Sequence, residues 1–342
     1  MQTRYLGKTG VSVSNLCLGA MMFGEWGTKD HDESIRIIHR ALDAGINFID
    51  TADTYSAGES EEIVGKALAG GRRENVVLAT KAHFPMGDDP NQRGNSRRWI
   101  ETEVENSLRR LQTDWIDLYQ IHRPDPDTDI DETLAVVSDL VHQGKIRYIG
   151  HSTFPASEIV EAQWTAERRG RERFRCEQPP YSILTRAVEH DVLPACQRHG
   201  MGVITYSPLA AGWLSGRYRK DADIQGPTSS ARQLLASRFD MSMEANQRKL
   251  DAAEQLAQLA DDAGMTLVEM AIAFVIRHPA ITAAIIGPRT MEHLESQLTA
   301  ADVSLTDDVL DRIDEIVPPG VTINHADNFW TQPALQPGRR RR

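Results

Sequence analysis

Four residues of types that transfer protons stand out within the first 122 positions, because three of them end apolar runs and the fourth lies close behind one. Asp50 ends the run GINFID, Lys81 ends NVVLATK and His122 ends WIDLYQIH. Tyr55 lies in the loop behind Asp50. Each residue alone has an ordinary structural interpretation, as a helix cap, a solvated cation or a structural histidine. Their occurrence at the ends of three successive predicted strands favours a shared site.

The chemistry that suits this set is general acid catalysis by a phenol. A tyrosine has a reference pKa of about 10 and donates a proton poorly at neutral pH. An ammonium group within a few ångströms lowers that pKa, so we expect Lys81 to lower the pKa of Tyr55 and Asp50 to keep Lys81 charged. His122 is expected to donate a hydrogen bond to a substrate carbonyl. These groups polarise and protonate a carbonyl but supply no nucleophile, and hydride from a nicotinamide would complete the reaction.

The elements that position these residues read as alternating strands and helices. Short apolar, largely β-branched runs predict eight strands, at 16–18, 46–49, 76–79, 116–121, 147–149, 174–177, 203–206 and 283–286. Segments with helical periodicity lie between them, at 31–44, 59–69, 96–111, 130–143, 156–169, 189–199, 266–278 and 290–299. Asp30, Ser96 and Asp129 stand at expected N-caps. Eight such pairs without a linker favour an α/β fold, a closed (β/α)8 TIM barrel, over a doubly wound sheet.

Two segments interrupt the alternation. Residues 2–13 predict a β-hairpin that could close the floor of the barrel. Residues 209–243 form a long, weakly periodic loop after the seventh barrel strand, and an extra helix follows near 247–263. Loops of this length are often lids, so we expect this one to cover a ligand. The chain as a whole (residues 1–342) is interpreted as a single barrel domain, with the barrel over about 1–325 and a tail over 326–342.

Composition limits the partners. The formal net charge of −11 argues against nucleic acid. No apolar run reaches the roughly 20 residues of a membrane helix, and the N-terminus lacks a secretory signal, so a cytoplasmic protein is expected. The three cysteines have no CxxC spacing and the eleven histidines no paired-ligand spacing, so no metal is expected.

Several motifs resemble the aldo-keto reductase family, over nearly the whole chain and in family order. They are LGKTGVSVSNLCLGAMMFG, FIDTADTYSAGESEEIVGKAL, LATKAH, LYQIHRPD, GKIRYIGHST, QPPYSIL, ITYSPLAAGWLSGRY and IIGPRTMEHLESQL. The sequence looks closest to the branch that holds bacterial general-stress reductases and the β-subunits of voltage-gated potassium channels. The resemblance implies that Asp50, Tyr55, Lys81 and His122 form the catalytic tetrad, with Tyr55 as the acid.

The resemblance also implies a binding site for NADP. The implied cofactor residues are Gly19, Met21, Asp50, Ser152, Gln178, Tyr206, Ser207, Leu209, Gly212, Gly287, Arg289, His293 and Gln297. Ser152 and Gln178 are expected at the carboxamide, and Tyr206 is expected to stack on the nicotinamide. Residues 207–212 are expected over the pyrophosphate and 287–297 at the adenosine. Thr153 and Gln297 replace asparagines that are common in the family.

Phosphate binding is expected without a Rossmann fingerprint, since no GxGxxG follows a strand. Arg289 at a helix start offers a guanidinium and the helix dipole to a phosphate, which favours NADPH over NADH. The expected function is therefore NADPH-dependent reduction of an aldehyde or ketone to an alcohol. The alternative is a nicotinamide-binding regulatory subunit or redox sensor with residual reductase activity.

The expected substrate pocket is apolar. Its predicted wall residues are Phe23, Trp26, Phe84 and Trp213. Phe329 and Trp330 in the tail are expected either to contact a small-molecule carbonyl substrate or to form the contact of a homo-oligomer.

Overall fold

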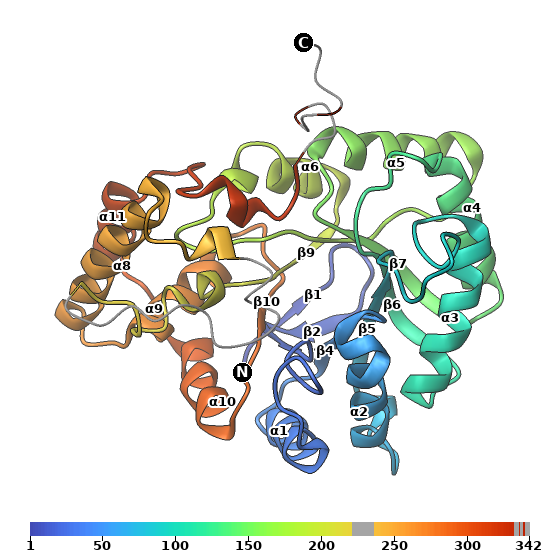
Figure 1. The fold of residues 1–342 in the computed structure, drawn as a ribbon, viewed down its shortest axis with the longest axis horizontal. Coiled ribbons are helices and arrows are strands. Elements are labelled where there is room, and N and C mark those ends of the chain that lie inside the picture. The colour runs from blue at the N-terminus through green and yellow to red at the C-terminus, as the bar shows by residue number, and fades with distance from the viewer. Residues whose placement is uncertain (221–235, 332–334, 336–337, 339–342) are drawn as a thin grey trace.

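The computed structural model describes residues 1–220, 236–331, 335 and 338, and its centre is a closed barrel of eight parallel strands (Figure 1). The strands are β3 (Leu16–Gly19), β4 (Phe48–Asp50), β5 (Val77–Ala82), β6 (Ile116–Ile121), β7 (Ile146–Ser152), β8 (Cys176–Gln178), β9 (Gly202–Thr205) and β10 (Ala283–Ile286). They follow one another around the barrel in chain order, and β10 pairs with β3 to close it. The predicted TIM barrel is confirmed, and the doubly wound alternative is wrong because the sheet has no free edge.

Helices surround the barrel and cover the outer faces of its strands (Figure 1). They are α1 (His31–Asp43), α2 (Glu59–Ala67), α3 (Arg97–Leu111), α4 (Ile130–His142), α5 (Ala156–Arg169), α6 (Val192–His199), α8 (Glu244–Asp262), α9 (Leu267–Arg277), α10 (Met291–Leu298) and α11 (Asp307–Ile316). The predicted caps are confirmed, since Asp30, Ser96 and Asp129 accept hydrogen bonds from backbone N–H groups of the first helical turns. Every residue of β3, β4, β6 and β8–β10 is buried, as expected for parallel strands covered on both sides.

One predicted helix begins late, and one observed helix has no counterpart in the prediction. The helix predicted at 189–199 begins only at Val192, because Ala187–Glu189 form a separate 3-10 turn. The helix α11 was not predicted, although the sequence carries a signal for it. Thr306 caps it by accepting from the Val309 N–H, and Val309 and Ile313 are buried four residues apart on one face.

The N-terminal hairpin closes one end of the barrel. Strands β1 (Thr3–Tyr5) and β2 (Ser12–Ser14) pair antiparallel, as predicted. Leu6 and Val13 are buried against inward-facing barrel side chains that include Phe48 and Leu118. Since the hairpin occupies the end where the barrel strands begin, the open mouth lies where they end.

The loop after β9 is described only at its two ends. Residues 221–235 of the predicted 209–243 lid lie outside the described residues. The extra helix α8 follows it, as predicted, and begins three residues before the predicted start at 247. Over the described parts of the chain, no helix combines the length and apolar character needed to cross a membrane.

Candidate active site

The four residues predicted to act on protons lie together at the open mouth. Asp50 is the last residue of β4, Lys81 lies one residue before the end of β5, and His122 directly follows β6. Tyr55 begins a 3-10 turn whose next two residues, Ser56 and Ala57, have positive φ angles of 50° and 55°. This strained turn follows β4 closely and brings the phenol back over the strand ends.

Lys81 is the centre of the group. Its Nζ donates to Asp50 Oδ2 at 2.6 Å, to the Thr51 carbonyl at 2.7 Å and to the Tyr55 hydroxyl at 3.3 Å. Its side chain is fully buried. A buried ammonium requires a carboxylate and full hydrogen bonding, and these contacts provide both. The phenol and the ammonium are therefore held within proton-relay distance of each other.

The protonation states differ in one respect from the sequence prediction. Burial alone would lower the pKa of Lys81, but Asp50 and Tyr55 raise it above its usual value, so the ammonium is retained. Burial raises the pKa of Tyr55, and this outweighs the opposing effect of Lys81. The expected net lowering of the Tyr55 pKa is thus wrong, because desolvation of the phenolate has a larger effect than the nearby ammonium. The consequence is a phenol that stays protonated at neutral pH.

His122 faces Tyr55 in a dry environment. Its ring lies 5.8 Å from the Tyr55 ring and 4.8 Å from the Phe84 ring, both in edge-on geometry. Burial, followed by the nearby charges of Arg123 and Lys81, holds the pKa of His122 well below its usual value, so the imidazole is neutral at pH 7. Its Nδ1 is buried and has no hydrogen-bond partner among the described residues. A neutral imidazole beside the Tyr55 phenol suits a hydrogen bond to a carbonyl ligand.

Gln120 belongs to this network, and the sequence analysis missed it. Its Nε2 donates to Asp50 Oδ1 at 3.0 Å, and Gln178 Nε2 donates to the same oxygen at 2.9 Å. The two amides are also joined, from Gln178 Nε2 to Gln120 Oε1, at 3.1 Å. The signal was present in the sequence, because Gln120 is a polar residue two positions before His122 and so on the same face of β6. Together these amides fix the carboxylate that fixes Lys81.

The predicted cofactor residues lie along the adjoining part of the rim. Ser152 ends β7, Gln178 ends β8 and Gly19 ends β3, while Tyr206 and Gly287 directly follow β9 and β10. These five strands are consecutive around the barrel, so the residues form one continuous arc beside the tetrad. Gln178 joins the arc to the tetrad through its bond to Asp50.

The loop after Tyr206 has the backbone of a binding loop. Ser207, Ala210, Ala211 and Gly212 all have φ between 49° and 100°. Such a concentration of left-handed backbone is typical of ligand-binding segments. Tyr206, Ser207, Leu209 and Gly212 all remain partly exposed there.

Most of the remaining predicted cofactor residues lie on the eighth strand–helix pair, β10 and α10. Arg289 immediately precedes Thr290, the N-cap of α10, and its guanidinium forms no ion pair with any carboxylate that the structure describes. His293 lies in the first turn of α10, and Met21 is 39% exposed on the loop after β3. The Oε1 atom of Gln297 is buried without a partner among the described residues. Exposed backbone and a cation without a described carboxylate partner fit a dinucleotide along this arc.

A comparison with known sequences identifies the family. The model of the Aldo/keto reductase family matches residues 15–318. The chain belongs to the aldo/keto reductase family. Its enzyme class is that of NAD(P)H-dependent oxidoreductases.

Several relatives of this aldo/keto reductase are similar over almost their full length. An uncharacterized oxidoreductase, YrpG, of Bacillus subtilis is 42% identical, over 94% of this chain and 97% of its own length. A probable voltage-gated potassium channel subunit beta of Arabidopsis thaliana is 36% identical, over 93% and 97%. The aldo-keto reductase YhdN of Bacillus subtilis is 35% identical, over 86% and 87%.

Two of the four predicted wall residues lie beside the tetrad of this aldo/keto reductase. Trp26 is partly exposed and its ring lies 6.0 Å from the Tyr55 ring. Phe84 is partly exposed and stacks edge-on against His122. These two rings form apolar surfaces on either side of the phenol and the imidazole.

The other two predicted wall residues are placed differently. Phe23 is fully buried in the main core, and Trp213 is 1% exposed. The Trp213 indole stacks on Tyr218 at 4.5 Å and on Phe239 at 6.0 Å, and its Nε1 donates to the Arg238 carbonyl. The expectation that they line the pocket is corrected: both support the loops from beneath, since their apolar surface is already covered by the protein.

The C-terminal segment reaches the cofactor arc. The Phe329 ring lies 5.0 Å from the Tyr206 ring at 76°, and the Arg238 guanidinium lies 3.8 Å from the Phe329 ring centre. On the other side, the Tyr206 hydroxyl is 3.1 Å from Thr153 Oγ1. Tyr206 is therefore held between the end of β7 and the tail.

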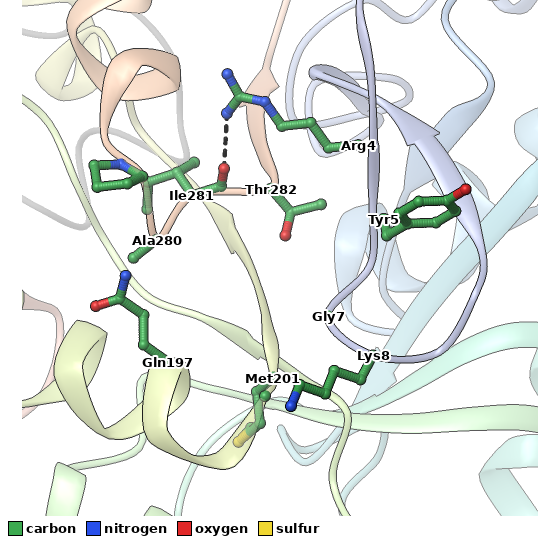
Figure 2. A pocket seen from close by; sticks show the side chains of 11 residues that line it. Arg4, Tyr5, Gly7, Lys8, Gln197, Met201, Ala280, Ile281 and Thr282 are labelled. Carbon is green, nitrogen blue, oxygen red and sulfur yellow. Dashed lines mark hydrogen bonds between the residues drawn. The ribbon is translucent and has the colours of Figure 1, made fainter.

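A pocket at the opposite end of the barrel is separate from this site. Figure 2 shows that it lies between the hairpin, with Arg4 and Lys8, and the residues just before β9 and β10, including Met201 and Thr282. Arg4 Nη1 donates to the Ile281 carbonyl there at 2.7 Å. Because catalytic groups in barrels of this type lie where the strands end, we assign this pocket no role in the reaction.

Proposed function

We propose that this protein reduces an aldehyde or ketone to an alcohol with NADPH, and that Tyr55 is the proton donor. The observation that carries the proposal is the contact of one buried ammonium, Lys81 Nζ, with both the Tyr55 hydroxyl and the Asp50 carboxylate. A phenol kept protonated by burial, next to a cation that stabilises the phenolate, is the arrangement that proton delivery to a carbonyl oxygen requires.

Each residue of the tetrad has a distinct task in this proposal. The neutral imidazole of His122 and the hydroxyl of Tyr55 orient the substrate carbonyl by hydrogen bonds. Tyr55 transfers its proton to the carbonyl oxygen as that oxygen gains negative charge. The ammonium of Lys81 then stabilises the phenolate, and Asp50, held by two amides, keeps the ammonium in place.

The bound nicotinamide supplies the hydride. Ser152 and Gln178 are the residues that would hold its carboxamide, and Tyr206 its ring face. Since Tyr206 is braced by Thr153 and Phe329, it is held in a defined position beside the tetrad. Trp26 and Phe84 would exclude water from the reacting carbonyl, which strengthens the electrostatic contacts around it.

We propose NADPH over NADH because of Arg289. Its guanidinium is partly exposed at the start of α10 and has no ion-pair partner among the described carboxylates. An unpaired guanidinium beside a helix N-terminus favours a cofactor with an additional phosphate. In Arg289→Met we expect KM for NADPH to rise about tenfold or more and KM for NADH to change little.

A second candidate function is a regulatory subunit whose cofactor redox state modulates a partner. It is supported by the 36% identity to a protein named as a probable potassium channel subunit beta. Single-turnover oxidation of bound NADPH by 4-nitrobenzaldehyde separates the two functions. A reductase oxidises the cofactor with a rate that Tyr55→Phe abolishes, whereas a sensor shows negligible oxidation in either form.

A further inference from the structure

Arg123 is a cation at the mouth that the proposed reaction does not use. It directly follows His122, and its Nη1 donates to the His122 carbonyl at 2.5 Å and to Ser152 Oγ at 3.2 Å. Its guanidinium lies 5.6 Å from the centre of the Phe84 ring. Two strand ends and one wall residue of the proposed pocket thus hold this side chain in place.

Arg123 has no carboxylate partner among the described residues. Four other arginines withdrawn from solvent are paired with carboxylates, whereas Arg289 on the same rim is not: Arg73 pairs with Asp117, Arg110 with Glu61 and Glu103, Arg186 with Glu189, and Arg238 with Asp327. Arg123 is partly buried and forms no ion pair with any carboxylate in the described part of the chain. Both of its hydrogen bonds go to neutral oxygens.

The free donors of Arg123 remain accessible. A guanidinium has five N–H donors, and only Nη1 of Arg123 donates to a described residue. Arg123 is partly exposed, and no described residue accepts a hydrogen bond from its Nε or Nη2. These donors are left for a ligand. The positive charge of Arg123 acts to lower the pKa of Tyr55, His122 and Tyr206. It thus disfavours the cation of His122 and favours the phenolates of the two tyrosines.

We propose that Arg123 is an anion-binding subsite that selects carbonyl substrates carrying a carboxylate. This inference rests on the proposed reductase function and adds a substrate class to it. A carbonyl held by Tyr55 and His122 would place an attached carboxylate near the guanidinium, because the guanidinium lies against the ring of Phe84, and that ring packs edge-on against His122. The net charge of −11 makes an anionic substrate unexpected from the surface as a whole, so the selection would come from this local cation.

The low dielectric of the site strengthens such a contact. Phe84 lies against the guanidinium, and His122 beneath it is neutral and buried. A charge-assisted hydrogen bond in a partly desolvated site favours the ionised ligand by a factor of about 10 to 100. The preference should appear in kcat/KM, since the same contact holds the substrate in the ground state and in the transition state.

The test compares acids with their neutral methyl esters. The substrates are the 2-, 3- and 4-carboxybenzaldehydes and the corresponding methyl formylbenzoates, with NADPH at pH 7.5. At least one acid should exceed its ester in kcat/KM by about tenfold or more. In Arg123→Met that acid should lose the advantage, while the ester changes by less than about threefold, and Arg123→Lys should keep part of it.

Arg147→Met is the matched control. Arg147 lies near the start of β7, at the opposite end of the strand from Ser152, and its substitution makes the same change in net charge. It should leave the ratio of acid to ester unchanged. A ratio near one in the wild-type protein, or an equal loss for acid and ester in Arg123→Met, would overturn the anion subsite.

Binding of the acids, followed by the fluorescence of Trp26 and the other tryptophans, separates this inference from the reductase proposal. Binding lost in Arg123→Met, with no turnover of any aldehyde, would support the subsite and reject the reductase. Turnover of acids and esters alike would support the reductase and reject the subsite. Neither turnover nor selective binding would reject both.

Discussion

Two lysines of this molecule are fully buried, and they differ in what surrounds them. Lys81 lies at the mouth with Asp50, while Lys249 in α8 lies beneath the C-terminal segment with Asp327. Both make a short contact to one carboxylate oxygen, at 2.6 Å and 2.9 Å. Yet the pKa of Lys81 is raised, whereas burial lowers the pKa of Lys249 below its usual value.

The difference lies in the neighbouring charges. Asp327 is shared with a second cation, since Arg238 Nε donates to its other oxygen at 2.5 Å. Asp50 has two neutral amides at its other oxygen, so its full charge acts on Lys81, and the Tyr55 hydroxyl adds to it. The same pair of residue types therefore gives a reactive group in one place and a structural link between loop, helix and tail in the other.

The largest effect should come from removing the ammonium of Lys81, and Lys249 provides the comparison. We expect Lys81→Met to lower the single-turnover rate of aldehyde reduction by a factor of about 10² to 10⁴, because the Tyr55 phenolate loses its stabilising charge. Lys249→Met should change that rate by less than about threefold, because Asp327 keeps its bond to Arg238. Stopped-flow loss of NADPH absorbance measures both. Equal losses in the two variants would mean that the lysines do not differ in role.

The next effect concerns stability at the structural lysine. Asp327→Ala should lower the free energy of unfolding by about 3–5 kcal/mol, because it leaves Arg238 and Lys249 buried without a carboxylate. Lys249→Met should cost about 1–2 kcal/mol, since one ion pair remains and the apolar side chain can pack against the rings of Trp213 and Phe239. Urea unfolding followed by circular dichroism gives both values. A cost for Asp327→Ala below that of Lys249→Met would contradict the shared-carboxylate account.

The sequence predicted most of what lies on regular elements. The alternation of apolar runs and helical segments was enough for the barrel, and strand ends were enough for Asp50, Lys81 and His122, because parallel strands must end at one rim. It did not predict the net pKa of Tyr55, which depends on how deeply tertiary packing buries the phenol. It misplaced Trp213 for a related reason: an aromatic residue in a loop can face a pocket or cover the core, and only the position of Arg238 and Phe239 decides.

The C-terminal segment and Gln120 show the same limit. The contact of Phe329 with Tyr206 joins residues far apart in the sequence, and no local pattern encodes it. Gln120 could have been found from strand alternation, but its bond to Asp50 depends on the register of three neighbouring strands. Local patterns gave the elements, and long-range contacts decided the details of the site.

The smallest effect should come from the support of Tyr206. Thr153 has a φ of 60°, which is unfavourable for a β-branched residue, and its hydroxyl is 3.1 Å from the Tyr206 hydroxyl. Thr153→Val keeps the shape and removes that bond, so we expect a loss of about 0.5–1.5 kcal/mol in the free energy of unfolding and a raised KM for NADPH. An unchanged KM in a variant of unchanged fold would show that Tyr206 needs no such support.

The central claim is that Tyr55, kept protonated by burial, gives its proton to the carbonyl oxygen. The most direct test is the single-turnover rate of NADPH oxidation by 4-nitrobenzaldehyde between pH 6 and 11, in the wild-type protein and in Tyr55→Phe. A general acid acts only while protonated, so the raised pKa of Tyr55 predicts a rate that is constant through neutral pH and falls only above its usual value of about 10. Tyr55→Phe should be slower by a factor of about 10² to 10⁴ and lack that fall. A variant as fast as the wild type, or a wild-type rate that falls well below pH 10, would contradict the claim.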